Sequence, residues 1–163
     1  MSENRPILHL MCGKIASGKS TLAAQLGAQD GHVIISEDDW LATLFSDQMT
    51  SISDYVRCSN KLQQIMGVHV ATLLNAGVSV VLDFPANTVA QRAWMRDILQ
   101  TTQADHQLHY LNMPDKTCIE RLHDRNALGE HPFSASEEQF ALISKHFVPP
   151  TEDEGFNIVL HSE

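Results

Sequence analysis

Cysteine is scarce in this chain of 163 residues, which contains only Cys12, Cys58 and Cys118. The three are an odd number at wide spacing and form no CxxC pair, so the sequence indicates neither a disulfide framework nor a thiol zinc site or redox motif. Free cysteines of this kind are typical of a reducing compartment. The expected location is therefore cytoplasmic.

Long apolar runs are also missing. No uninterrupted stretch approaches the roughly 20 residues that a membrane helix needs. The first twelve residues, MSENRPILHLMC, lack the basic flank, long apolar run and small-residue cleavage site of a secretory leader. The sequence thus predicts neither a membrane span nor a membrane partner.

Basic residues are few, because eleven Lys and Arg stand against twenty Asp and Glu and give a formal net charge of −9. A field of this sign repels polyanions, so a nucleic-acid partner is not expected, apart from an exposed 5′ end. The nine histidines show no HExxH or similar spacing that would indicate a zinc site. Composition therefore favours a small-molecule partner and leaves the oligomeric state open.

Short apolar segments alternate with segments of helical periodicity along the chain. Strands are expected at residues 7–12, 33–35, 78–82, 108–111 and 156–160. Helices are expected at residues 19–26, 36–45, 53–76, 88–100, from 114 onward and 136–147. The sequence contains no linker or repeat, so this alternation predicts one α/β domain over residues 1–163. We expect the three-layer αβα arrangement of a P-loop NTPase, with a mostly parallel five-stranded sheet between two layers of helices and a small lid at about 126–138.

Residues 13–20, GKIASGKS, satisfy the pattern GxxxxGK[ST] between a predicted strand and a predicted helix. This is the Walker A pattern of a phosphate-binding P-loop. Gly13 and Gly18 permit a close backbone approach that a Cβ would block, so that successive N–H groups can converge on phosphate oxygens at a helix N-terminus. A plain glycine turn is the alternative, but it does not explain the lysine and hydroxyl that follow.

ATP and Mg²⁺ are the expected cofactors of this loop, although the motif alone leaves ATP against GTP open. The residues expected to bind the nucleotide are Gly13, Lys14, Ile15, Ala16, Ser17, Gly18, Lys19, Ser20 and Thr21. Lys19 would place its charge on the β- and γ-phosphates, and the Ser20 hydroxyl would be a ligand of Mg²⁺.

Carboxylates follow the next two predicted strands. Asp38 and Asp39 come directly after the second strand, and Asp83 ends the third. Because strand ends meet at one edge of a parallel sheet, these side chains are expected near the P-loop. Asp38 or Asp39 could deprotonate an acceptor hydroxyl, with helix capping as the alternative. Asp83 is expected to join Ser20 at the metal.

Two arginines, Arg121 and Arg125, lie four residues apart on the helix that follows the fourth strand, so both project from one face. They are predicted to close on the phosphates like an internal arginine finger, with solvated ion pairs as the alternative. Arg92 and Arg96 repeat this spacing after the third strand. For these two, a surface salt bridge is at least as well supported by the pattern.

The segments GKIASGKST, ISEDDW, VVLDFPANT with Arg92, and RLHDRN resemble the small P-loop kinases grouped with polynucleotide kinase, zeta toxins and chloramphenicol phosphotransferase, including bacterial members described as AAA family ATPases or predicted kinases. The resemblance spans about residues 7–126. It implies that Asp38 is the base, with Asp39 as its rival, and that Arg125 is the lid arginine. One departure is the tripeptide of residues 84–86, which separates Asp83 from Asn87.

The sequence therefore predicts a kinase that transfers the γ-phosphoryl group of Mg-ATP to a hydroxyl of a small acceptor. Its expected catalytic residues are Lys19, Asp38, Asp83 and Arg125. The alternative is an ATP-dependent switch, or a slow ATPase, that acts through a protein partner. The acceptor is expected among small metabolites, nucleosides and sugar nucleotides.

Overall fold

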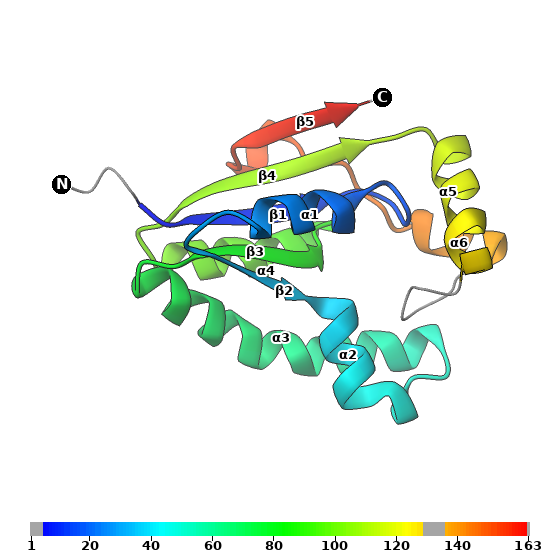
Figure 1. Cartoon of the computed structure of the whole chain (residues 1–163), viewed down its shortest axis with the longest axis horizontal. Helices are drawn as coiled ribbons and strands as arrows, with labels where there is room; N and C mark the ends of the chain where they lie inside the picture. Colours follow the sequence, from blue (N-terminus) through cyan, green and yellow to red (C-terminus); the bar gives the residue numbers. More distant parts are fainter. Residues whose placement is uncertain (1–4, 129–135, 163) are drawn as a thin grey trace.

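A parallel sheet of five strands forms the centre of the molecule in a computed structural model that describes residues 5–128 and 136–162 (Figure 1). The strand order is β2-β3-β1-β4-β5, and every strand pairs in parallel with its neighbours. The strands are β1 (Ile7–Cys12), β2 (His32–Ser36), β3 (Ser79–Pro85), β4 (Asp105–Asn112) and β5 (Ile158–Ser162). The predicted α/β fold is confirmed, and the sheet is wholly rather than mostly parallel.

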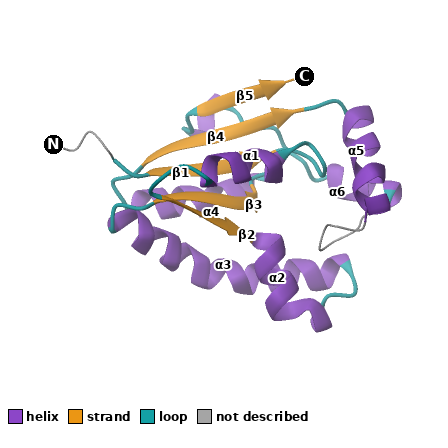
Figure 2. Ribbon diagram, in the orientation of Figure 1, coloured by secondary structure: helices purple, strands orange, loops and turns teal. Residues whose placement is uncertain are grey.

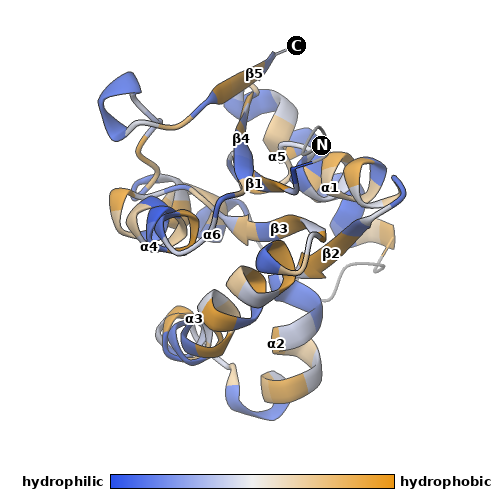
Figure 3. Ribbon diagram, turned by 90° about the vertical axis from the view of Figure 1, so that its left-hand side faces the viewer, coloured by the Kyte–Doolittle hydropathy of each residue, from blue (hydrophilic) through white to orange (hydrophobic). Residues whose placement is uncertain are grey.

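Helices cover both faces of this sheet (Figure 2). The helices of the described residues are α1 (Lys19–Gly27), α2 (Glu37–Phe45), α3 (Ile52–Asn75), α4 (Val89–Gln100), α5 (Asp115–Leu128) and α6 (Glu137–Ser144), with short 3₁₀ turns η1 (Ser46–Gln48) and η2 (Glu152–Glu154). Helix α1 lies on one side of the sheet, and α3 and α4 lie on the other (Figure 3). Helices α2, α5 and α6 lie at the end to which the strands point (Figure 1).

Three apolar clusters hold these layers together. The largest lies between the sheet and α3 and α4, and includes Leu10, Leu62 and Met95. A smaller cluster joins α1 to the sheet through Ala23. The third, centred on the fully buried Leu122, joins α5 and α6 to two residues of the predicted P-loop, Ile15 and Ala16. The glycine loop is therefore braced by packing from outside the strand and helix that it connects.

Serine and threonine side chains begin four of the helices, where a hydroxyl can accept from a backbone N–H that has no partner within the helix. Ser36, Ser51, Thr88 and Ser136 each accept a hydrogen bond from the backbone N–H three residues later. At α6 a capping box is complete, because the N–H of Ser136 also donates to the Gln139 side chain. At Thr88 the Gln91 side chain accepts from the N–H of Asn87 instead.

Several predicted boundaries were wrong: β4 already begins at Asp105, β5 runs from Ile158 to Ser162, and two further differences have identifiable reasons. Strand β3 continues past Asp83 to Pro85, because an irregularity between Leu10 and Met11 shifts the register of β1 against it and pairs Met11 with Pro85. Helix α6 ends at Ser144 rather than at 147, and the chain then turns so that the N–H of Val148 donates to the carbonyl of Asn87 at 2.8 Å.

The sheet order places β3 between β1 and β2, so the strand that leads into α2 is not adjacent to β1, the strand that leads into the P-loop. The register pairs Ser36 at the end of β2 with Asp83 in β3. The first turn of α2 therefore begins beside Asp83. Among the described residues, no helix is long and apolar enough to cross a membrane.

Three histidines form a row on the sheet face that carries α1. Nδ1 of His9 lies 3.0 Å from Nε2 of His109, and Nδ1 of His109 lies 3.0 Å from Nε2 of His161. Burial, and less strongly the neighbouring histidines, lower the pKa of His9 and His109 to about 4. Within the described ranges, no three metal-ligating side chains are grouped so as to hold a metal ion. His9 and His109 are therefore uncharged at neutral pH.

We expect this row to make the fold sensitive to mild acid. The folded state keeps His9 and His109 neutral down to about pH 4, whereas an unfolded histidine takes up a proton near pH 6.5. The free energy of unfolding should therefore fall as the pH decreases from about 6.5 to 4, by an amount on the order of 3 kcal/mol for each of the two histidines. Urea unfolding at pH 7 and pH 5 measures this slope.

The double variant His9→Gln, His109→Gln should show a shallower slope, because glutamine does not titrate. His123→Gln, at an exposed histidine of α5, is the matched control and should keep the original slope. Equal slopes in the wild type and the double variant would contradict this account.

Candidate functional site

The loop between β1 and α1 has the open backbone that a phosphate requires. Ala16 has a φ of 62°, and Gly18, the N-cap of α1, has a φ of 105°. A Cβ on Gly13 would lie 2.4 Å from the Ser17 Oγ. That Oγ is itself buried and has no hydrogen-bond partner within the described residues. The loop therefore forms a cradle, a concave space at Gly13 that a Cβ would fill, next to the Ser17 hydroxyl that has no partner among the described residues. Such a space suits the binding of an anion.

Lys19 lies across this cradle. Its Nζ donates hydrogen bonds to the carbonyl oxygens of Gly13 and Lys14, the latter at 3.0 Å. Burial lowers the pKa of Lys19, whereas the carboxylates of Asp83 and Asp38 act to raise it. The ammonium group is thus held at the mouth of the loop, where phosphate oxygens could replace the two carbonyl acceptors.

The side chains of Ser20 and Asp83 are in direct contact. The Ser20 Oγ donates to the Asp83 Oδ2 at 3.2 Å. Burial raises the pKa of Asp83, while Lys19 and the Ser20 hydroxyl act to lower it. A hydroxyl and a carboxylate at this separation are the hard oxygen donors that Mg²⁺ prefers, so the pair fits the proposed metal.

Asp38 and Asp39 occupy different positions on the first turn of α2. Asp38 is half-buried, and its charge acts to raise the pKa of both Lys19 and Arg125. Asp39 is exposed, and its backbone N–H donates to the Ser36 Oγ at 3.3 Å. The geometry therefore brings Asp38, rather than Asp39, into electrostatic contact with both predicted phosphate-binding cations.

The two arginines of α5 approach the loop differently. Arg121 Nη1 donates to the carbonyl oxygen of Ser17 at 3.1 Å. Arg125 has a buried Nε without a hydrogen-bond partner in the described part of the chain, and burial lowers its pKa. Of the lid predicted at about 126–138, residues 129–135 lie outside the described residues; the flanking parts end α5 and begin α6.

A buried carboxyl beside Asp38 was missed in the sequence. Glu37 is 1% exposed and accepts hydrogen bonds from the Tyr55 hydroxyl and, at 2.8 Å, from the Ser59 hydroxyl. Burial raises the pKa of Glu37 to about 7, with a further contribution from Asp38 and Asp83. Glu37 therefore ties the turn that carries Asp38 to α3. The spacing of Tyr55 and Ser59, four residues apart on one helix face, was the available signal.

A second missed residue is Asn87. Its Oδ1 accepts from the N–H of Gly13 at 2.9 Å, and its Nδ2 donates to the carbonyl of Gly13 at 2.9 Å. The tripeptide of residues 84–86, which departs from the family pattern, includes the continuation of β3 that pairs with Met11. This extension brings Asn87 alongside the first residue of the loop, where it acts as a clamp on the backbone.

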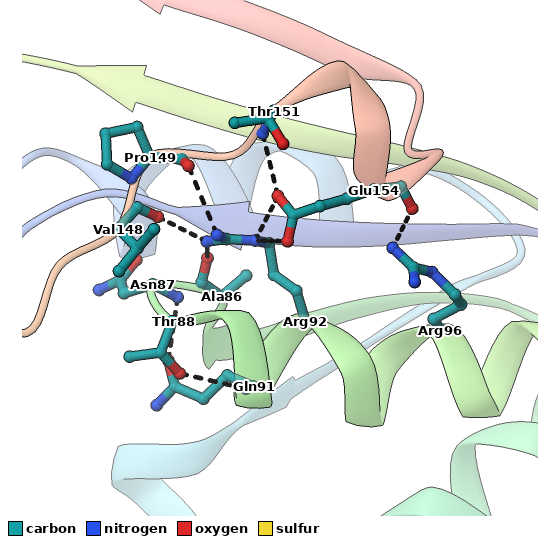
Figure 4. A network of polar contacts seen from close by, with 10 residues as sticks. All are labelled: Ala86, Asn87, Thr88, Gln91, Arg92, Arg96, Val148, Pro149, Thr151 and Glu154. Carbon is teal, nitrogen blue, oxygen red and sulfur yellow. Dashed lines mark hydrogen bonds and ion pairs between the residues drawn. The ribbon is translucent and has the colours of Figure 1, made fainter.

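For Arg92, neither a contact with the phosphates nor a surface salt bridge is found, because the side chain is buried in another part of the molecule. It is 0% exposed, and its guanidinium pairs with Glu154 at 2.9 Å and donates to the carbonyls of Ala86 and Val148 at 2.9 and 2.8 Å (Figure 4). Arg96, one helical turn on, donates to the carbonyl oxygen of Glu154. Both arginines therefore fasten the C-terminal segment to α4, and Arg92 also fastens it to the loop that carries Asn87.

Comparison with known proteins agrees with this geometry. A family model described as "AAA domain" matches residues 8–150. A candidate kinase from Chloroflexus aurantiacus is 19% identical, with a TM-score of 0.76 over 99% of this chain and 87% of that chain. Kti12 of Chaetomium thermophilum, solved with ADP-AlF3, is 12% identical, with a TM-score of 0.70 over 96% and 89% of the two chains.

The APS kinase CysC of Mycobacterium tuberculosis, solved with AMPPNP and APS, is 17% identical, with a TM-score of 0.61 over 96% of this chain and 88% of that chain. A search of curated protein sequences finds no match. At these identities the solved structures establish the P-loop fold, and the chemistry has to be argued from the residues of this chain.

Removing the clamp on Gly13 should weaken nucleotide binding. Asn87→Ala deletes two 2.9 Å hydrogen bonds to the backbone of Gly13, so part of the binding energy is then needed to order the loop. We expect the Kd for Mg-ATP to rise by about tenfold in isothermal titration calorimetry. Asn75→Ala, which removes one 3.5 Å contact at the end of α3, is the control. An unchanged Kd in Asn87→Ala would show that the clamp is dispensable.

Arg92→Leu should lower the free energy of unfolding by about 3 kcal/mol, because it leaves Glu154 and several backbone carbonyls without their donor. Arg57→Leu removes an exposed pair with Asp54 and should cost much less. Urea denaturation of both variants measures the difference. Equal losses in the two variants would contradict the role of Arg92 as a buried fastening.

Proposed function

This chain belongs to the AAA domain family, which agrees with its predicted likeness to small P-loop kinases, and we propose that it transfers the γ-phosphoryl group of Mg-ATP to a hydroxyl of a small acceptor. The observation that carries the proposal is the convergence of Lys19, Asp83, Asp38 and Arg125 beside an open phosphate cradle. A kinase-like fold alone would support a phosphotransferase only in general.

The proposed chemistry assigns a separate task to each group. Asp38 accepts the proton of the acceptor hydroxyl, whose oxygen forms a bond to the γ-phosphorus as the bond to the bridging oxygen breaks and ADP leaves. Lys19 and Arg125 face the charge that develops on the transferred group. Ser20 and Asp83 would hold Mg²⁺, which supplies neutralisation of phosphate charge when bound.

Backbone groups of the loop complete the proposed nucleotide site. The N–H groups from Gly13 to Thr21 would surround the phosphates, and Arg121, already bonded to the Ser17 carbonyl, would stiffen the loop next to them. We also propose that residues 1–163 act as one domain. A cytoplasmic location, where Mg-ATP is available, is part of the same proposal.

A second candidate function, an ATP-dependent switch or slow ATPase, is favoured by one observation. Gly13 is bonded through Asn87 to the backbone of Val148, and Arg92 connects the same loop to Glu154. A change at the loop could thus reach the C-terminal segment, where a partner could read it. Slow ATP hydrolysis that no small acceptor accelerates would support this candidate over the kinase.

Transfer from γ-labelled ATP to a panel of nucleosides, sugars, amino alcohols and oligonucleotide 5′ ends tests the kinase. Asp38→Asn should lower the transfer rate by a factor on the order of 10² to 10⁴, because it removes the proposed base, while the affinity for Mg-ATP stays nearly constant. Asp39→Asn is the matched control, because the same change is made one residue away at an exposed position. A larger loss in Asp39→Asn would transfer the role to Asp39.

A further inference from the structure

The backbone on either side of the clamp residue Asn87 is itself held by hydrogen bonds. Ala86 and Asn87 each have one backbone donor and one backbone acceptor to satisfy. The N–H of Ala86 donates to the carbonyl of Met11 at 2.9 Å, and the N–H of Asn87 donates to the Gln91 side chain at 2.9 Å. The two donors are thus satisfied by β1 and α4, and the two carbonyls need donors from elsewhere.

Both carbonyls depend on the chain that returns after α6. The carbonyl of Asn87 accepts from the N–H of Val148 at 2.8 Å. The carbonyl of Ala86 accepts from Nη1 of Arg92 at 2.9 Å, and the same nitrogen donates to the carbonyl of Val148 at 2.8 Å (Figure 4). The guanidinium of Arg92 therefore joins the loop that carries Asn87 to the C-terminal segment of residues 148–154.

Glu154 fixes the position of this guanidinium. Its two carboxylate oxygens accept from Nε of Arg92 at 2.9 and 3.1 Å, and one of them also accepts from the N–H of Thr151 at 2.9 Å. Burial acts to raise the pKa of Glu154, but the hydrogen bonds from Arg92 and Thr151 outweigh it and lower that pKa. Because Arg92 is fully buried, water cannot take the place of this carboxylate. The ion pair is therefore formed at neutral pH and holds Arg92 in place.

The side chain of Asn87 carries this support to the residue at which the phosphate-binding loop begins. Both polar groups of the Gly13 backbone bond to it at 2.9 Å. The Gly13 carbonyl also accepts from Nζ of Lys19. A displacement of Asn87 would therefore disturb both the start of the cradle and an acceptor that orients its lysine.

We propose that Glu154 is a positioning residue for nucleotide binding, and that it acts through Arg92 and Asn87 on the backbone of Gly13. The proposal rests on the binding of Mg-ATP at the loop, which is part of the proposed function, and does not depend on the acceptor. The hydrogen bonds of Glu154 are made to Arg92, Arg96 and the backbone of its own segment, so its effect on the loop has to pass through Arg92. Order that these bonds supply in advance does not have to be supplied by the binding energy of the nucleotide.

A double-mutant cycle with the full chain tests this route. Glu154→Ala should raise the Kd for Mg-ATP by about fivefold in isothermal titration calorimetry, because Asn87 loses part of its support. In the Asn87→Ala background the same substitution should change the Kd by less than about twofold, because the clamp through which it acts is already absent. Glu152→Ala, at an exposed position of the same 3₁₀ turn, is the matched control and should leave the Kd unchanged. Equal effects of Glu154→Ala in the two backgrounds would overturn the proposal.

Hydrogen exchange at the amide of Gly13 supplies a readout that needs no nucleotide. This N–H donates to Asn87, so Glu154→Ala should increase its exchange rate in NMR by about fivefold, whereas Glu152→Ala should not. Glu154→Gln keeps an acceptor for Arg92, should give an intermediate rate and Kd, and takes over the test if the alanine variant does not fold. An unchanged exchange rate at Gly13 would overturn the proposal and leave the proposed function intact, whereas a wild-type chain that does not bind Mg-ATP would overturn both.

Discussion

The open turn between β1 and α1 is held by groups from two distant parts of the chain, the loop after β3 and helix α5. Asn87 clamps both polar groups of Gly13, Arg121 holds the carbonyl of Ser17, and the cluster around Leu122 packs on Ile15 and Ala16. A backbone bent in this way leaves several N–H groups without a hydrogen-bond partner. Without these contacts, the loop would favour a conformation in which the N–H groups bond to other groups of the protein. The preformed cradle reduces the ordering cost of binding, which would otherwise lower the affinity.

Charge is concentrated at the same edge of the sheet. Burial raises the pKa of both Glu37 and Asp83, Asp38 adds to the rise in both, and Lys19 acts to lower the pKa of Asp83. Such a group of carboxylates is costly to bury unless hydrogen bonds and cations compensate it. Here the compensation is local: two hydroxyls on Glu37, the Ser20 hydroxyl and Lys19 on Asp83, and Arg125 near Asp38. The site therefore attracts cations, and a polyphosphate is acceptable only together with the metal and arginines that offset its charge.

Features that depend on one continuous segment of the chain could be predicted from the sequence. The strand, glycine loop and helix of residues 7–27 lie where the local pattern predicted them. The roles of Asn87 and Arg92 could not be predicted, because both depend on partners remote in the chain: a register irregularity in β1 and the return of residues 148–154. The insertion of β3 between β1 and β2 is likewise a property of the assembled sheet. Local periodicity carries no information about strand order.

The sheet order also explains why a residue that begins α2 can act at a loop two strands away. Since β3 separates β1 from β2, Asp83 lies between the loop and Asp38, and its carboxylate reaches Ser20 on one side while its strand pairs with Ser36 on the other. Glu37 then fixes the turn of α2 against α3, so that Asp38 is directed by two neighbours rather than by its own flexible side chain. The proposed base is thus held through the backbone of the turn, so its position does not depend on which acceptor binds.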